Sequence, residues 1–136
     1  MSTVYTGIAT ASGRDGRAVS SDGILDLTLA RQKEMGGSGA GTNPEQLFAA
    51  GYAACYSSAL SLVARSRKID VSDVSVTAEV SLLKDDGGFG LGVTLRVELP
   101  DELHGEVGQG LVEAAHQVCP YSKATRGNIP VELVVE

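Results

Sequence analysis

The chain has 136 residues, a length typical of one domain, and 43% of them are hydrophobic, enough for a substantial core. Its net charge of −6 argues against nucleic-acid binding, which requires a basic surface. Residues 1–5 show no basic region leading into an apolar run, so no signal peptide is expected. No apolar stretch approaches the roughly 20 residues of a membrane span. We therefore expect a cytoplasmic protein without a membrane partner.

The first thirty residues predict short strands joined by tight turns. Residues 12–17 and 21–23 each contain Asp-Gly, a hairpin signal. Three leucines at positions 25, 27 and 29 alternate with polar residues, the pattern of a half-buried strand. Residues 33–41 form a glycine-rich loop with no Lys-Ser or Lys-Thr after it, which excludes a Walker phosphate loop. We expect this loop to be a flexible flap over a site.

A long helix is predicted from Pro44 onward. Asn43 can cap it, Pro44 suits its first turn, and Gln46 stands where a capping-box partner belongs. Small and apolar residues then recur at helical spacing, which places Cys55 on the buried face. The stripe comprises Leu47, Gly51, Cys55, Ala59 and Leu62.

The remaining sequence predicts a hairpin, a second helix and a last strand. Residues 74–82 and 89–99 alternate between apolar and polar residues on either side of an Asp-Asp-Gly-Gly turn. Pro100-Asp101 opens a helix with a stripe of Leu103, Val107, Leu111, Ala114 or Ala115, and Val118, and Pro120 ends it. A polar segment leads to a strand at 131–135. This order indicates an α+β fold with antiparallel sheets, as one domain over residues 1–136.

The two cysteines lie in different settings. Cys55 is in the middle of a helix, whereas Cys119 is at the end of one, where the negative end of the helix dipole opposes ionisation. Because the thiolate is the nucleophilic form, we expect Cys55 to attack and Cys119 to be the second thiol if the two work as a pair. In a cytosolic protein a disulfide is more often catalytic or redox-sensing than structural. The alternative is that each cysteine is an inert, buried hydrophobe.

A buried nucleophilic cysteine needs a cation nearby, because an apolar setting raises the pKa of a thiol. Four candidates lie in polar segments on either side of the two predicted helices. They are Arg14, Arg17, Lys123 and Arg126. Arginine suits the role best because it stays charged and forks toward anions, but the sequence alone does not choose among these residues.

Glu45 precedes Cys55 by ten residues, so on one continuous helix the two are about 15 Å apart along the axis. They cannot touch, although a carboxylate could orient an arginine that reaches toward the thiol. Three arrangements stay open. One long arginine could span part of the distance, a second copy of the chain could bring its own helix alongside, or the helix could bend at Gly51.

Two further groups of residues have both a structural and a functional interpretation. His104 and His116 are too few and too isolated for a metal centre. His116, one turn before Cys119, could act as a base, although a partly buried helical histidine is the simpler interpretation. Leu47, Phe48, Tyr52 and Tyr121 are mostly core residues, some of which could line an apolar substrate channel. We assign substrate contact to Phe48 and Tyr121.

Two long segments carry a resemblance to a known family. Residues 42–55, Thr-Asn-Pro-Glu-Gln-Leu-Phe-Ala-Ala-Gly-Tyr-Ala-Ala-Cys, and residues 118–129, beginning Val-Cys-Pro-Tyr-Ser, resemble the two signature stretches of the organic hydroperoxide resistance proteins, the Ohr branch of the OsmC/Ohr family. Residues 13–16 resemble the arginine turn of that family, and residues 20–23 fit it too. The match runs nearly end to end. One departure is Lys123, where many relatives would carry asparagine.

The resemblance implies a thiol-dependent peroxidase that acts on organic hydroperoxides, in an intertwined homodimer with an OsmC/Ohr-like fold. By motif position, Cys55 would be the peroxidatic cysteine, Cys119 the resolving cysteine, Arg14 the activating arginine and Glu45 its partner. No bound cofactor is implied, and the reductant would be dihydrolipoamide, often carried on a lipoylated protein. The rival functions are a redox sensor or disulfide-exchange protein that uses the same cysteine pair, and a binding dimer with inert thiols.

Overall fold

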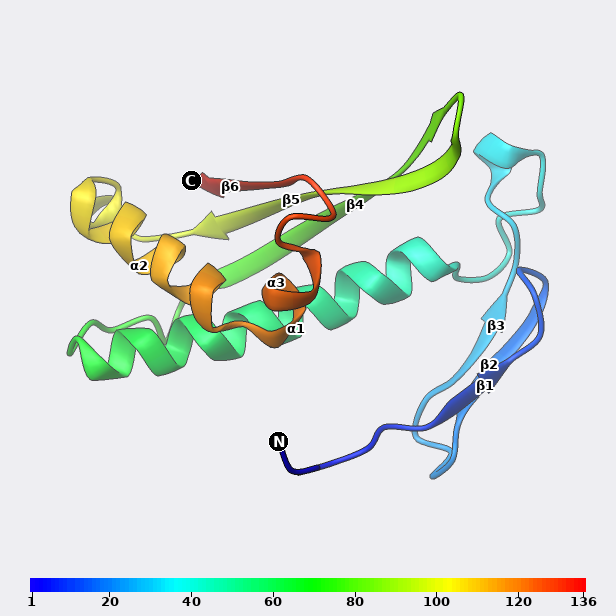
Figure 1. Ribbon diagram of the computed structural model, residues 1–136, viewed down its shortest axis with the longest axis horizontal. Coiled ribbons are helices and arrows are strands. Elements are labelled where there is room, and N and C mark those ends of the chain that lie inside the picture. Colours follow the sequence, from blue (N-terminus) through cyan, green and yellow to red (C-terminus); the bar gives the residue numbers. More distant parts are fainter. The chain divides into compact units, whose positions relative to one another are not determined.

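The computed structural model describes all of residues 1–136, and the chain divides into two units, Met1–Leu47 and Phe48–Glu136. The boundary falls within helix α1 (Pro44–Ser66). Each unit is built around a sheet of its own, β1-β2-β3 in the first and β4-β5-β6 in the second (Figure 1).

The first unit is a small antiparallel sheet, as the two Asp-Gly turns predicted. Strands β1 (Ala9–Ala11), β2 (Gly16–Ser20) and β3 (Asp26–Leu29) pair in chain order. The turn between β1 and β2 requires glycine at position 13, where φ is +70°, a conformation that other residues rarely adopt. The turn therefore presents Arg14 at the end of the sheet.

The glycine-rich loop, for which the sequence predicted a flexible flap, is tied at its end to the segment of β3, and its flexibility stays a prediction. It contains a short 3₁₀ turn, η1 (Lys33–Met35), and its end is hydrogen-bonded back to the β3 segment. Ala30 N–H donates to the Thr42 carbonyl at 3.0 Å, and Thr42 N–H donates to the Thr28 carbonyl at 2.9 Å. A Cβ at Gly41 would lie 2.6 Å from the Thr28 carbonyl oxygen, so glycine is what permits this close return.

Helix α1 begins where the sequence predicted, with half of the expected capping box. Asn43 Oδ1 accepts a hydrogen bond of 2.9 Å from the Gln46 N–H, which satisfies one free donor of the first turn. The side chain of Gln46 does not return to the Asn43 peptide. Its Oε1 instead accepts a 2.7 Å hydrogen bond from the hydroxyl of Thr42.

The buried face of α1 is rotated from the predicted stripe. Leu62, placed on that stripe, is 57% exposed, and Cys55 is half-buried rather than buried. Two tyrosines four residues apart fill the core in place of the small residues, because each hydroxyl finds a partner there. The buried residues of the helix are Tyr52, Tyr56, Ala59, Leu60, Val63 and Ala64.

The second sheet contains the long hairpin that the alternation predicted. Strands β4 (Ser75–Asp85) and β5 (Gly88–Glu98) pair antiparallel along their full lengths, from Ser75 opposite Glu98 to Asp85 opposite Gly88. The last strand, β6 (Val131–Val135), lies beside β5 and runs parallel to it, so the expectation of purely antiparallel sheets was wrong for this strand (Figure 1). The helical crossover between β5 and β6 is long enough to allow parallel pairing.

The second helical region differs from its prediction at both ends. Residues 101–103 form a separate 3₁₀ turn, η2 (Asp101–Leu103), and helix α2 (Glu106–Val118) starts only after the extended backbone at Gly105. Val107 and Val118, assigned to its buried stripe, are exposed, whereas Leu111, Val112, Ala115 and His116 are buried. Pro120 ends α2 but also occupies the first turn of a short third helix, α3 (Pro120–Thr125), where a polar segment was expected.

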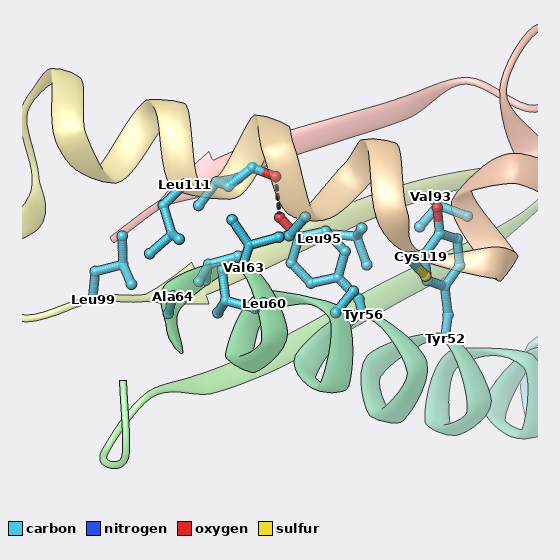
Figure 2. Close-up of a cluster of buried hydrophobic side chains, with 14 residues drawn as sticks. Tyr52, Tyr56, Leu60, Val63, Ala64, Val93, Leu95, Leu99, Leu111 and Cys119 are labelled. Atoms are coloured by element: carbon cyan, nitrogen blue, oxygen red, sulfur yellow. Dashed lines mark hydrogen bonds between the residues drawn. The ribbon is translucent and has the colours of Figure 1, made fainter. Parts of the chain in front are cut away.

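The core of the second unit lies between helices α1 and α2 and the inner face of the sheet. Figure 2 shows Leu60, Val63 and Leu111 among the buried side chains that the helices contribute, and Val93 and Leu95 of β5 belong to the same cluster. Alternate residues of β4 and β6 pack against the same cluster. Cys119 belongs to this core, and its side chain is fully buried.

Helix α1 is long and apolar enough to cross a membrane by length and composition alone, contrary to the expectation that no stretch would qualify. The core helix of a soluble protein passes the same test, and α1 contributes buried side chains to the core from Tyr52 to Ala64. The apolar character of α1 is thus explained in part by this packing.

Candidate active site

The two cysteines meet in the second unit. Sγ of Cys119 lies 3.3 Å from Sγ of Cys55, and both are free thiols. Cys55 sits mid-way along α1, and Cys119 occupies the single residue between α2 and α3. Because sulfurs in a disulfide are about 2.05 Å apart, only a small approach separates this pair from bonding. Cys55 is the more accessible of the two, since Cys119 is fully buried.

The surroundings of Cys55 oppose its ionisation. Burial raises the pKa of the Cys55 thiol above its ordinary value, a hydrogen bond from the peptide N–H of Tyr121 lowers it, and the adjacent Cys119 raises it again. No cation is among these causes. A reactive Cys55 therefore needs a positive charge that its immediate neighbours do not supply.

Cys119 lies between the ends of two helices whose dipoles act on it in opposite directions. Cys119 does follow the last turn of α2, as predicted, but it also immediately precedes the first turn of α3. The negative end of one helix and the positive end of the next thus face the same residue, and their effects oppose each other. The unequal accessibility of the two sulfurs therefore distinguishes them better than the helix dipoles do.

A bidentate ion pair joins Arg14 and Glu45 in the first unit. Nη2 of Arg14 lies 2.7 Å from Oε1 of Glu45, and Nη1 lies 3.0 Å from Oε2. The side chains are 28% and 11% exposed. The hydrogen bond from Arg14 lowers the pKa of Glu45, and the same bond raises the pKa of Arg14, so both groups are held in their charged forms. The pair forms within one chain, between the β1–β2 turn and the first turn of α1.

The other candidate cations are engaged elsewhere or exposed. Arg17 forms an ion pair with Asp26 across strands β2 and β3. Arg126 donates a 2.7 Å hydrogen bond to the backbone carbonyl of His116. Lys123 is exposed in the last turn of α3. Only Arg14 presents a guanidinium fixed by both oxygens of a carboxylate, the arrangement expected of an oriented cation.

Three aromatic rings cluster near Cys55: Phe48 and Tyr52 lie about two turns and one turn before it on α1, and Tyr121 comes from α3. The ring centroids of Phe48 and Tyr121 are 6.2 Å apart, and those of Tyr52 and Tyr121 are 5.8 Å apart. Tyr121 was expected in the core but is 41% exposed. It rests directly on Gly51, where an added Cβ would lie 2.9 Å from the Tyr121 hydroxyl. Gly51 is one helical turn from Cys55, so this aromatic surface adjoins the thiol.

A buried hydrogen-bond network that the sequence did not predict also lies in the second unit. Nδ1 of His116 is 2.8 Å from the Ser122 hydroxyl, and the Tyr52 hydroxyl is 2.8 Å from Ser122 and 3.1 Å from Thr125. His116 is thus a buried helical histidine with a partner, and burial lowers its pKa. Spacing could not reveal the network, because the chain turns at Cys119, between His116 and Ser122.

These residues form no metal centre, and one cleft of the second unit lies apart from them. No group of three or more His, Cys, Asp or Glu side chains is placed to hold a metal ion. A cleft of about 360 Å³ opens at the other end of the second unit, and its lining includes four acidic side chains but no cysteine. Those side chains belong to Asp70, Asp73, Glu98 and Glu102.

The model of the family described as OsmC-like protein matches residues 36–134. An organic hydroperoxide resistance protein of Xanthomonas axonopodis pv. citri is 53% identical over 135 residues, which cover 97% of this chain and 94% of the relative. The chain belongs to the OsmC/Ohr family. The crystal structure of Bacillus subtilis OhrB, 48% identical, matches the fold with a TM-score of 0.87 over 98% of this chain and 100% of that one. A putative Vibrio cholerae organic hydroperoxide resistance protein, with captopril bound in one of its active sites, is 50% identical, with a TM-score of 0.88 over 99% and 94% of the two chains.

Membership in the OsmC/Ohr family confirms the predicted fold and the resemblance on which it was based. The structure brings the predicted site residues together as three pairs. These are Arg14 with Glu45, Cys55 with Cys119, and Phe48 with Tyr121. The first pair lies in the first unit and the other two in the second. The chemical role of each residue stays a prediction.

Proposed function

We propose that this protein is a cytoplasmic thiol-dependent peroxidase that reduces organic hydroperoxides to alcohols. The observation that carries the proposal is the pair of free thiols 3.3 Å apart, one accessible and one buried, in a chain 53% identical to an organic hydroperoxide resistance protein. An accessible thiol can meet the peroxide, and a buried thiol at contact distance can close a disulfide as soon as the first is oxidised.

In the first step, the Cys55 thiolate attacks the terminal oxygen of the hydroperoxide, the one that carries the hydrogen. The O–O bond breaks, Cys55 becomes a sulfenic acid, and the departing alkoxide takes a proton and leaves as the alcohol. Arg14 supplies the positive charge that the immediate neighbours of Cys55 lack, and it stabilises the charge developing on the leaving oxygen. Glu45 holds the guanidinium by both oxygens and so orients it.

In the second step, Cys119 attacks the sulfenic acid of Cys55. A disulfide forms between the two residues and the hydroxyl leaves as water. An external dithiol then reopens the disulfide by two successive exchanges and becomes a disulfide itself. We propose dihydrolipoamide, free or on a lipoylated protein, as this reductant, with no cofactor bound to the protein.

The aromatic surface of Phe48 and Tyr121 favours apolar substrates. An alkyl group that settles there leaves water, which stabilises binding by roughly 0.8 kcal/mol per CH₂. Hydrogen peroxide has no such group. Cumene hydroperoxide should therefore be reduced with a higher kcat/KM than hydrogen peroxide, and the reverse order would contradict this assignment of the aromatic surface.

The deciding experiment counts thiols before and after one equivalent of cumene hydroperoxide, and then follows turnover with dihydrolipoamide or with thioredoxin as reductant. Loss of both thiols with turnover on dihydrolipoamide supports the peroxidase. Slow oxidation with no turnover favours a redox sensor, and exchange with many disulfides would indicate a disulfide-exchange protein. Thiols that do not react with the hydroperoxide would favour the remaining alternative, a binding dimer with inert thiols. The lack of a Cys-x-x-Cys motif already counts against general disulfide exchange.

We also propose that the active form is an intertwined homodimer. The ion pair of Arg14 and Glu45 is complete within one chain, so the open question is whose Cys55 it serves. Mixing Cys55→Ser chains with Arg14→Ala chains under subunit exchange answers it. Recovered activity means that the pair of one chain acts on the thiol of the other. No recovery in proven heterodimers means that each site is built within one chain.

A further inference from the structure

The buried polar network of the second unit brackets both cysteines. Tyr52 is three residues before Cys55 on α1, His116 is three residues before Cys119 on α2, and Ser122 is three residues after it on α3. The hydroxyl of Ser122 bonds to His116 and to Tyr52 at 2.8 Å each, so one side chain links all three helices. Tyr52 and Ser122 are fully buried.

Only one assignment of donors and acceptors satisfies all of the hydrogen bonds in the network. Each hydroxyl carries one proton, and the Thr125 hydroxyl donates its own to the backbone carbonyl of Ser122 at 3.1 Å. Tyr52 must then donate to Thr125, and Ser122 must donate to Tyr52. His116 Nδ1 must therefore carry a proton and donate to Ser122. Every member is satisfied, and a fully satisfied buried network rigidifies the elements that it joins.

A second hydrogen bond holds the connection between α2 and α3 in place. The guanidinium of Arg126, which follows α3, donates a 2.7 Å hydrogen bond to the backbone carbonyl of His116. Helix α3 and the residue after it are thus hydrogen-bonded to α2 through His116, and the Tyr52 hydroxyl links α3 to α1. Cys119 itself has little freedom to move away from Cys55.

We propose that Tyr52, Ser122 and His116 are positioning residues that hold Cys119 against Cys55 and so set the rate of disulfide closure. This inference deepens the proposed function and rests on it for the identity of the oxidant. Holding two reacting groups in place raises their effective concentration. The network acts on the second step, attack of Cys119 on the sulfenic acid, and leaves the first step to Cys55 and its cation.

The chain offers a matched control one turn along the same helix. Tyr56 is also fully buried, and its hydroxyl donates a 2.6 Å hydrogen bond to the backbone carbonyl of Val112, drawn as a dashed line in Figure 2. That bond joins α1 to the middle of α2 and does not reach α3. Tyr56→Phe therefore removes a buried tyrosine hydroxyl without loosening the residues around Cys119.

The test compares Tyr52→Phe and Ser122→Ala with Tyr56→Phe in two measurements. In the first, each protein is equilibrated in dithiothreitol redox buffers, and the fraction with an intrachain disulfide is measured by mass spectrometry. No peroxide is involved, so this arm tests the positioning even if the proposed peroxidase activity fails. The network variants should lower the effective thiol concentration by about fivefold to tenfold, the value of one buried hydrogen bond. Tyr56→Phe should stay within about twofold of the wild type.

The second measurement follows the two oxidation steps separately after a pulse of cumene hydroperoxide. The network variants should form the sulfenic acid at the wild-type rate but close the disulfide more slowly, and excess peroxide should convert more of them to sulfinic acid. Circular dichroism checks that each variant is folded. If Tyr52→Phe is not folded, Ser122→Ala alone is compared with the control. Unchanged closure in a folded network variant, or equal slowing in Tyr56→Phe, would overturn the inference.

Discussion

The two units hold their chemical groups by different physical means. The first presents a charged pair on a three-stranded sheet of short strands, where Arg14 is fixed by two hydrogen bonds to one carboxylate. The second holds two thiols within a core of packed side chains and a satisfied polar network. The charge is thus oriented by one interaction, whereas the thiols are oriented by many.

Because of this difference, substitutions in the two units should affect activity and stability to different extents. The Arg14–Glu45 pair is partly buried, with side chains 28% and 11% exposed, but it is a single ion pair outside the main core, so its loss should change the chemistry more than the fold. A buried side chain near the thiols takes part in packing, so its loss affects both. The predictions below test that separation, beginning with the largest expected effect.

Cys55→Ser should abolish peroxidase turnover, because the hydroxyl of serine does not ionise near neutral pH and cannot replace the attacking thiolate. The measurement is steady-state reduction of cumene hydroperoxide with dihydrolipoamide. Retained activity would refute the assignment of Cys55.

Cys119→Ser is the matched variant of the other thiol. It should still consume about one equivalent of peroxide in its first turnover and then stall as the sulfenic acid, or oxidise further. A Cys119→Ser protein that turns over as fast as the wild type would show that no resolving thiol is needed.

Arg14→Ala should move the ionisation of Cys55 to higher pH, because the proposed cation no longer favours the thiolate. The rate of Cys55 alkylation against pH measures this directly, and kcat/KM should fall by about 10- to 100-fold at neutral pH, as expected for a shift of one to two pKa units. Thermal unfolding should change less than it would for a core substitution, since one ion pair outside the main core is lost.

The neighbouring ion pair supplies the control. Arg17→Ala removes the pair with Asp26 from the same sheet and should leave the alkylation profile in place. An unchanged profile in Arg14→Ala together with a shifted one in Arg17→Ala would transfer the role to Arg17. Glu45→Gln should have an intermediate effect, because it keeps Arg14 but loosens its orientation.

Gly51→Ala should reduce the preference for bulky hydroperoxides while preserving the fold. The new Cβ would lie 2.9 Å from the Tyr121 hydroxyl, so the ring must move from its place beside Cys55. Alanine is the better helix former by about 1 kcal/mol, which offsets the cost of that movement. The ratio of kcat/KM for cumene hydroperoxide to that for hydrogen peroxide should fall several-fold. A ratio unchanged from the wild type would separate Tyr121 from substrate binding.

Local sequence rules predicted the elements of this fold better than the faces they bury. The Asn43 cap, the β4–β5 hairpin and the Asp-Gly turns depend on neighbouring residues, and the structure confirms them. The buried face of α1 depends on the sheet and on α2, which lie far away in the sequence. The tyrosines at 52 and 56 are buried only because Ser122, Thr125 and Val112 supply partners for their hydroxyls.

In the candidate site, too, features set by neighbouring residues could be predicted and contacts between distant residues could not. Spacing along α1 could place Cys55 but could not bring Cys119 to it, because that contact depends on the turn between α2 and α3. The pairing of Arg14 with Glu45 joins residues 31 positions apart and came only from the resemblance to the family. The polar network had no sequence signal at all, since its members lie on three helices.

The smallest expected effect is a pH dependence of stability from the first unit. Arg14 holds the pKa of Glu45 below its ordinary value of 4.5, so the charged carboxylate is favoured by folding. A carboxyl group with a lowered pKa stabilises the fold above its ordinary pKa, and this contribution disappears as the pH falls through the lowered value. The wild type should therefore be slightly more stable than Glu45→Gln at pH 7, and the difference should shrink as the pH falls below the ordinary pKa of 4.5.

Urea unfolding at several pH values between about 7 and 3 measures this difference. His116 also responds to acid, because its lowered pKa means that folding favours the neutral ring and that stability declines as the pH falls through its ordinary value of 6.5. That decline is common to both proteins and cancels in the comparison, since His116 belongs to the second unit and Glu45 to the first. A difference that stays constant down to pH 3 would mean that the Arg14–Glu45 pair orients a charge without stabilising the fold.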